Sequence, residues 1–140
     1  MRILAIDLGD VRTGLAFCDE LETFAAPLCT ITETNRKKLI EKIAEQIQAL
    51  KIETVVVGNP INMNGSLGPR SAKCKTFAAA LQKTVNVPAV LWDERQTTLM
   101  ANKIMANVNT KKKHKKMMVD KIAAVLILES FLSFRKNMTY

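Results

Sequence analysis

The 140-residue sequence has few of the residues that cross-link small extracellular domains. It holds three cysteines, an odd number, and no C-x-x-C pair, so a disulfide framework is not expected. Cys18 and Cys29 stand in apolar stretches typical of strands. We therefore predict that all three cysteines, Cys74 included, are reduced packing residues in a cytoplasmic protein.

Long uninterrupted apolar runs are also missing. The most apolar stretch, residues 119–134, is interrupted by Asp120, Lys121, Glu129 and Ser130, which predicts a core helix rather than a membrane span. Residues 1–3 run directly into the first expected strand, so we expect no signal peptide and no membrane partner. No linker, repeat or low-complexity segment is seen, which predicts one domain over residues 1–140.

Acidic residues are too few to balance the basic ones. The net charge is +8 and the pI about 9.6, which favours a polyanionic partner, first nucleic acid and second an anionic membrane surface. Solvated surface lysines are the simpler alternative. Aromatic residues are also scarce, at 5%. We predict that the single tryptophan, Trp92, belongs to the core rather than to a surface on which bases stack.

The pattern of apolar residues predicts an α/β fold. Short apolar runs typical of strands lie at 3–6, 15–18, 24–31, 53–58 and 87–92. Helical periodicity marks 32–51, 68–86, a short segment from 97 or 98 to about 107, and about 117–134. The order is βββαβαβαα. Short connections predict that the first three strands are antiparallel, and the crossovers predict two further parallel strands in a mixed five-stranded sheet flanked by helices.

Acidic side chains stand where two of the parallel strands end. Asp7 ends the first strand and Glu94 follows the fifth. The carboxyl ends of parallel strands meet at one edge of a sheet, where ligands bind. Alternation allows only one of Asp93 and Glu94 to face Asp7 readily. The simpler alternative for Asp7 is an ordinary hydrogen bond in a turn.

A third acid, Asp120, lies about one turn into the last predicted helix, in an apolar surrounding. It is either an acid that the helix dipole favours or a member of the same site as Asp7 and Glu94. Three carboxylates at one crevice repel one another unless a cation neutralises them. Such an oxygen-rich site suits Mg²⁺ or Mn²⁺, as one or two ions that catalyse phosphodiester hydrolysis.

The segment 110–116, which we predict to be a loop just before Asp120, consists of Thr110, five lysines and His114. Its position favours contacts with phosphates, and a solvated surface loop is the alternative. It lacks aromatic residues, so base stacking is not indicated. We expect His114 to be one more polar loop residue rather than a metal ligand or general base.

Four motifs in this order resemble those of the YqgF/RuvX family, and together they span nearly the whole chain. They are Asp7-Leu8-Gly9…Arg12-Thr13-Gly14, Gly58-Asn59-Pro60…Asn62-Met63-Asn64-Gly65, Trp92-Asp93-Glu94-Arg95…Thr97-Thr98 and Val119-Asp120-Lys121…Ala123-Ala124…Ile127-Leu128.

The resemblance implies a ribonuclease H-like fold related to RuvC Holliday-junction resolvases. It implies a cytoplasmic nuclease that processes the 5′ end of precursor 16S rRNA or resolves branched DNA. Carried over by motif, Asp7, Glu94 and Asp120 become the catalytic, metal-binding acids. The residues that we expect to contact nucleic acid are Arg12, Asn62, Arg95, Lys111, Lys112, Lys113, Lys115 and Lys116.

One departure concerns the fourth strand. Related resolvases and ribonuclease H enzymes carry an acid at its end, whereas this chain has Gly58-Asn59-Pro60. Either Glu94 substitutes from the next strand, or the site holds only one tightly bound metal.

Two other functions stay open at this point. One is a nucleic-acid-binding module without catalysis, and the other is a nucleotide-binding domain like those of actin and sugar kinases, suggested by Asp7-Leu8-Gly9 and Thr13-Gly14. The oligomeric state is also open: a homodimer would favour branched DNA, and a monomer would favour single cuts in RNA.

Overall fold

The computed structural model describes residues 1–60, 64–94 and 112–138, with the backbone alone at 112–121 and 138. Within these residues it confirms the predicted sheet. The strands are β1 (Ile3–Asp7), β2 (Arg12–Phe17), β3 (Ala26–Thr32), β4 (Thr54–Asn59) and β5 (Ala89–Asp93). Their order is β3-β2-β1-β4-β5, with β1, β2 and β3 paired antiparallel and β4 and β5 added in parallel.

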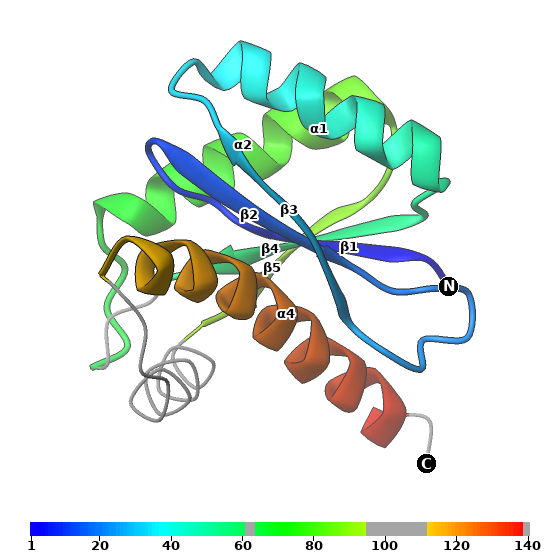
Figure 1. The fold of residues 1–140 in the computed structure, drawn as a ribbon. Coiled ribbons are helices and arrows are strands. Elements are labelled where there is room, and N and C mark those ends of the chain that lie inside the picture. The colour runs from blue at the N-terminus through cyan, green and yellow to red at the C-terminus, as the bar shows by residue number, and fades with distance from the viewer. Residues whose placement is uncertain (61–63, 95–111, 139–140) are drawn as a thin grey trace.

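In the described ranges, three helices cover the two faces of the sheet (Figure 1). They are α1 (Arg36–Leu50), α2 (Pro69–Val85) and α4 (Lys112–Met138). Helices α1 and α2 lie together on one face, and α4 crosses the other, packing on β1, β2 and β3. The short helix predicted from 97 or 98 to about 107 falls outside the described residues. In the described part of the chain, no helix is both long and apolar enough to cross a bilayer.

Strand alternation divides the apolar residues between the two layers. Leu4 and Ile6 point toward α1 and α2, while Ile3 and Ala5 point toward α4. Both faces of β1 and β4 are therefore buried, which explains why these strands are continuous apolar runs rather than alternating ones. Asp7 follows Ile3 and Ala5 on the side of β1 that faces α4, and the apolar run ends at this residue.

The helix ends follow from local sequence. Asn35 caps α1 by accepting a hydrogen bond from the Lys38 amide at 3.0 Å. Lys51 ends this helix in the left-handed conformation, with φ 55°. Pro69 opens α2, where its missing N–H costs no helical hydrogen bond.

Several boundaries differ from the sequence-based prediction. Strand β2 begins at Arg12 rather than at residue 15, and α1 begins at Arg36 rather than at residue 32. Strand β3 begins at Ala26 rather than at residue 24. Helix α4 begins at Lys112 rather than near 117, so the lysine segment predicted as a loop forms the first turns of this helix. Lysine is a good helix former, and the segment contains no glycine or proline to stop a helix. Asp120 consequently lies more than two turns inside α4, not one.

Trp92 is half-buried and packs against the core, in agreement with the prediction. Its ring meets Phe131 edge to face, with centroids 5.4 Å apart, and its indole N–H donates to Ser130 Oγ at 3.1 Å. The cysteines are free thiols; Cys18 and Cys74 are buried, and Cys29 is half-buried. They contribute packing rather than cross-links.

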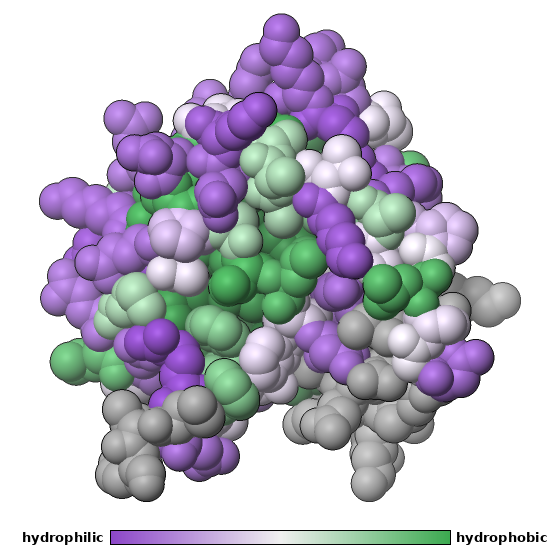
Figure 2. Space-filling model, turned by 180° about the vertical axis from the view of Figure 1, so that it is seen from behind, coloured by the Kyte–Doolittle hydropathy of each residue, from purple (hydrophilic) through white to green (hydrophobic). Residues whose placement is uncertain are grey.

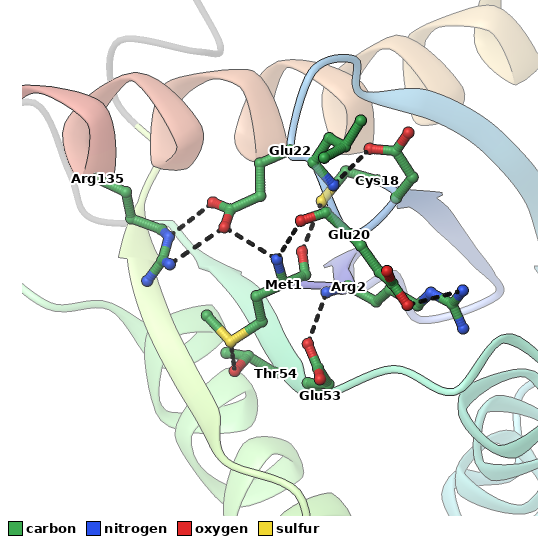
Figure 3. Close-up of polar contacts among 10 residues, drawn as sticks. Met1, Arg2, Cys18, Glu20, Glu22, Glu53, Thr54 and Arg135 are labelled. Atoms are coloured by element: carbon green, nitrogen blue, oxygen red, sulfur yellow. Dashed lines mark hydrogen bonds and ion pairs between the residues drawn. The ribbon is translucent and has the colours of Figure 1, made fainter.

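Far from the carboxyl edge of the sheet, Glu22 fastens the end of α4 (Figure 3). Arg135 donates from Nε and Nη2 to the two oxygens of this carboxylate, at 2.9 and 3.3 Å. The Met1 amino group contacts the same carboxylate at 3.1 Å. The bond with Arg135 is the largest influence on the Glu22 pKa, and it lowers the pKa below the ordinary 4.5.

We predict that Arg135→Gln lowers the free energy of unfolding by up to about 1 kcal/mol at neutral pH. The Glu22–Arg135 pair is bidentate, but its partial exposure to solvent limits its contribution. Because the pKa of Glu22 is lower in the folded than in the unfolded protein, its ionisation stabilises the fold at pH values above the unfolded-state pKa. This stabilisation disappears as the pH falls through the folded-state pKa. Urea unfolding of wild type, Glu22→Gln, Arg135→Gln and the double variant gives the coupling free energy. Equal coupling at pH 7 and about pH 3 would contradict this assignment.

Candidate active site

The first acid stands at the end of β1. Ile3 and Ala5 of this strand pack under α4, so alternation turns Asp7 to the same side. Its side chain is half-buried, at the point where the apolar run stops. Asp7 therefore lies at the edge of the sheet, partly sheltered but open to a ligand.

Glu94 reaches the same place from β5. Its amide donates to the Asn59 carbonyl at 3.2 Å, which extends the parallel pairing of β4 and β5 by one residue. A Cβ placed on Gly58 would lie 2.5 Å from Glu94 Oε1 and 2.7 Å from its Cδ. The Glu94 carboxyl thus occupies the space that a side chain at Gly58 would need.

The carboxyl groups of Asp7 and Glu94 share a hydrogen bond. Burial raises the pKa of Glu94, and the bond with Asp7 and the positive charge of Arg70 oppose that rise. Two carboxyls in contact cannot both stay ionised in a sheltered place unless a proton or a cation lies between them. Because the donors are hard oxygens, the pair fits a divalent ion such as Mg²⁺ or Mn²⁺.

A buried polar contact holds the end of β4. Ser71 Oγ donates to Asn59 Oδ1 at 2.7 Å, and both residues are buried. This bond ties the last residue of β4 to the first turn of α2. Since the Asn59 carbonyl also receives the Glu94 amide, the contact fixes the backbone from which Glu94 projects.

The turn after Asp7 is held from both helices of one layer. Arg36 of α1 donates to the Gly9 carbonyl at 3.0 Å, and Arg70 of α2 donates to the Leu8 carbonyl at 3.4 Å. The Gly9 amide donates to Thr13 Oγ1 at 3.3 Å. A Cβ at Gly9 would overlap the Arg12 carbonyl oxygen, so the turn requires glycine.

Sequence reasoning did not single out Arg36, Arg70, Asn59 or Ser71 as parts of the site. A weak signal was present for Arg70, which follows the proline that opens α2. Asn59 stands in the Gly58-Asn59-Pro60 motif, but no comparable signal marks Arg36 or Ser71, because their contacts depend on residues elsewhere in the sequence.

The third predicted acid lies in α4. Position 120 falls on the same stripe of this helix as Ala124 and Ile127, which are buried against the sheet. A Cβ at Gly58 would lie 2.6 Å from Ile127 Cδ1, so this stripe passes over Gly58. The side chain of Asp120 lies outside the described part of the chain. Among the residues that are described, no group of three His, Cys, Asp or Glu side chains could hold a metal.

The predicted nucleic-acid contacts are placed only in part. Arg12 begins β2, half-buried, beside the turn that follows Asp7. Lys112, Lys113, Lys115 and Lys116 belong to the first turns of α4, and their side chains are not described. Asn62, Arg95 and Lys111 fall outside the described residues.

Comparison with known proteins agrees with this geometry. Residues 1–134 match the family model RuvX, described as "Holliday junction resolvase". A protein of Bacillus subtilis is 41% identical over 134 residues, which cover 94% of this chain and 97% of that protein. One of Thermoanaerobacter pseudethanolicus is 38% identical over 138 residues, covering 98% and 99%. Both relatives carry the name "Putative pre-16S rRNA nuclease".

Solved structures share the fold. RuvC of T. thermophilus, in complex with a Holliday junction substrate, aligns with a TM-score of 0.58 at 16% identity over 96% of each chain. The fowlpox virus Holliday junction resolvase aligns with a TM-score of 0.56 at 13% identity, over 95% of this chain and 99% of that one. These likenesses confirm the predicted ribonuclease H-like, RuvC-like fold. Taken with the family match and the curated relatives, they place this chain in the RuvX family of nucleases.

Proposed function

We propose that this chain is a nuclease that depends on a divalent metal and hydrolyses phosphodiester bonds of structured nucleic acid. Its main substrate would be the 5′ end of precursor 16S rRNA, in the cytoplasm. The observation that carries the proposal is the contact between the Asp7 and Glu94 carboxyls at the ends of β1 and β5. The names of the curated relatives favour the RNA substrate.

In this proposal Asp7 and Glu94 hold the ion, and Asp120 completes its ligands from α4. Bound Mg²⁺ or Mn²⁺ would supply an activated water and stabilise the leaving oxygen. Asp7 and Glu94 favour a cation because their like charges are held together at a sheltered edge. The positive charge of Arg70 opposes the rise that burial causes in the pKa of Glu94.

The position of Glu94 supports one explanation of how the site works without an acid at the end of β4. The backbone at Gly58 carries no side chain, and the Glu94 carboxyl fills that space from the neighbouring strand. We infer that Glu94 replaces the acid that related enzymes carry at the end of β4. The number of ions that bind then depends on which ligand oxygens Asp120 adds to those of Asp7 and Glu94.

Branched DNA is a second candidate substrate, because the matching family model is described as a Holliday junction resolvase. Cutting a four-way junction on two strands requires two active sites. We therefore expect a homodimer if the junction is the substrate, and a monomer suffices for single cuts in RNA.

The test compares both substrates under the same conditions. Purified protein is incubated in Mn²⁺ with a precursor RNA that carries the 5′ extension of 16S rRNA, and separately with a four-way DNA junction. We expect cleavage of the RNA that stops when EDTA removes the metal. Cleavage of the junction alone would replace RNA by DNA as the substrate, and metal-independent cleavage would contradict the role of the acids.

A thermal melt in the same buffers separates the enzyme from a binding module. Mn²⁺ that binds the folded chain should raise the melting temperature, since a ligand at about 100 times its dissociation constant stabilises by about 2.7 kcal/mol. Absence of any shift, together with RNA binding but no cleavage, would favour a module that binds without cutting.

A further inference from the structure

Helices α1 and α2 together carry a cluster of cations, and only its two arginines contact the proposed active site. Their first turns hold Arg36, Lys37 and Lys38 in α1, and Arg70 followed by Lys73 in α2. We call these five residues the basic rim. Neither first turn contains an acid, although the helix dipole favours acids there and disfavours cations. Stability of the helices therefore does not account for this arrangement.

The basic rim adjoins the acid pair. Arg70 is bonded to the carbonyl of Leu8, the residue after Asp7, and its charge acts on Glu94. Arg36 is bonded to the next carbonyl, that of Gly9. In Figure 1 the starts of α1 and α2 lie on the same side of the molecule as the turn between β1 and β2. The two arginines are thus held in place by the turn that follows Asp7.

Two acids, Asp10 and Glu33, offset part of the charge of the five rim cations, and Glu33 acts on Lys38. Asp10 pairs with Arg36 at 3.5 Å and with Lys73 at 3.4 Å, and it is largely exposed itself. The Lys37, Lys38, Arg70 and Lys73 residues are exposed. Viewed from behind, hydrophilic side chains cover the top of the molecule, where α1 lies (Figure 2). The rim is therefore a cationic surface that solvent reaches.

A groove of about 590 Å³ runs between the two helices from this rim. Arg36, Lys73 and Asp10 line it, and its apolar part includes Ile40 and Phe77. A concave surface lined by cations concentrates a positive field and draws in anions. Lysines and arginines that neutralise phosphates supply most of the affinity of proteins for nucleic acid.

We propose that the basic rim binds the phosphates of the substrate strand next to the bond that is cut, on the α1–α2 side of Asp7 and Glu94. This inference rests on the proposed nuclease function. It places a strand across the edge of the sheet, between the basic rim and the lysine-rich start of α4. The phosphate chemistry is common to RNA and DNA, so the rim positions the strand without selecting its sequence.

The experiment uses one lysine from each helix and a matched control. In the rim variant, Lys37→Gln and Lys73→Gln are combined; in the control, Lys51→Gln and Lys83→Gln remove the same charge from the opposite ends of α1 and α2. Fluorescence anisotropy in EDTA measures binding of a labelled RNA stem–loop with a single-stranded 5′ extension, over a series of salt concentrations. We expect the rim variant to bind about 10-fold more weakly, and its salt slope to fall by about 1.4, or 0.7 for each lost single-strand contact.

The control should keep the wild-type affinity and slope. If the rim variant binds as wild type does, or the control weakens binding equally, the rim is not the contact surface, even though wild-type cleavage in Mn²⁺ would still support the nuclease. If wild type binds no nucleic acid, both the proposed function and this inference fail.

Discussion

Asp7→Asn is expected to abolish cleavage while the protein stays folded. The substitution keeps the shape of the side chain but removes one of the two carboxylates that meet at the end of β1. Loss of an outer partner of a metal ligand typically costs 10- to about 100-fold in metal affinity or activity, so loss of a direct ligand should cost at least about 100-fold. Initial rates in Mn²⁺ with the precursor RNA measure this loss.

Thermal unfolding in EDTA shows whether the fold is retained. We expect the melting temperature of Asp7→Asn to equal or exceed that of wild type, because the new amide can still donate a hydrogen bond to Glu94 and no longer brings a second ionisable carboxyl beside it. Asp19→Asn is a suitable control, since Asp19 is an exposed acid beyond the other end of β2. Wild-type rates for Asp7→Asn would remove Asp7 from the catalytic machinery.

Gly58→Ala should reduce cleavage strongly although it adds only a methyl group. That methyl would lie 2.5 Å from Glu94 Oε1 and 2.6 Å from Ile127 Cδ1, well inside normal contact. The Glu94 side chain is the easier of the two to displace, because Ile127 is fully buried. A displacement of about 1 Å in an active site can cost about 100-fold in rate.

The measurement is again the rate in Mn²⁺, combined with a Mn²⁺ titration followed by thermal melting. We expect weaker metal binding together with a small change in stability in EDTA. Glu94→Asp shortens the displaced side chain and so leaves more room for a methyl group at position 58. Adding Gly58→Ala to the Glu94→Asp variant should therefore reduce the cleavage rate by a smaller factor than adding it to wild type does. Full activity and metal affinity in Gly58→Ala would show that the Glu94 carboxyl does not lie over this glycine during catalysis.

Much of the fold could be predicted because each strand of the sheet has a clear apolar pattern. Alternation along β5 also predicted that only one of Asp93 and Glu94 faces Asp7. In the structure that residue is Glu94. The predicted start of α4 was wrong because lysines are equally suited to an exposed loop and to an exposed helical turn. A pattern of charges without apolar residues has no period that distinguishes the two.

The supporting contacts of the site could not be predicted for a different reason. Arg70 lies 62 residues from its partner Leu8, and Arg36 lies 27 residues from Gly9. Ser71 and Asn59 are closer in sequence, but only the packing of α2 against β4 buries them together. Such partners depend on the tertiary structure, and a single sequence carries no periodicity that reveals them.

The ion pair between Glu22 and Arg135 influences the opposite end of α4 because this helix is long. Arg135 and position 120 are separated by about 22 Å along the helix axis. A pivot of about 5° at the Glu22 anchor would therefore sweep position 120 through about 2 Å. Under the proposed mechanism, the Glu22 contact helps to fix where α4 presents position 120, so a mutation at Glu22 is expected to slow the enzyme without touching the substrate.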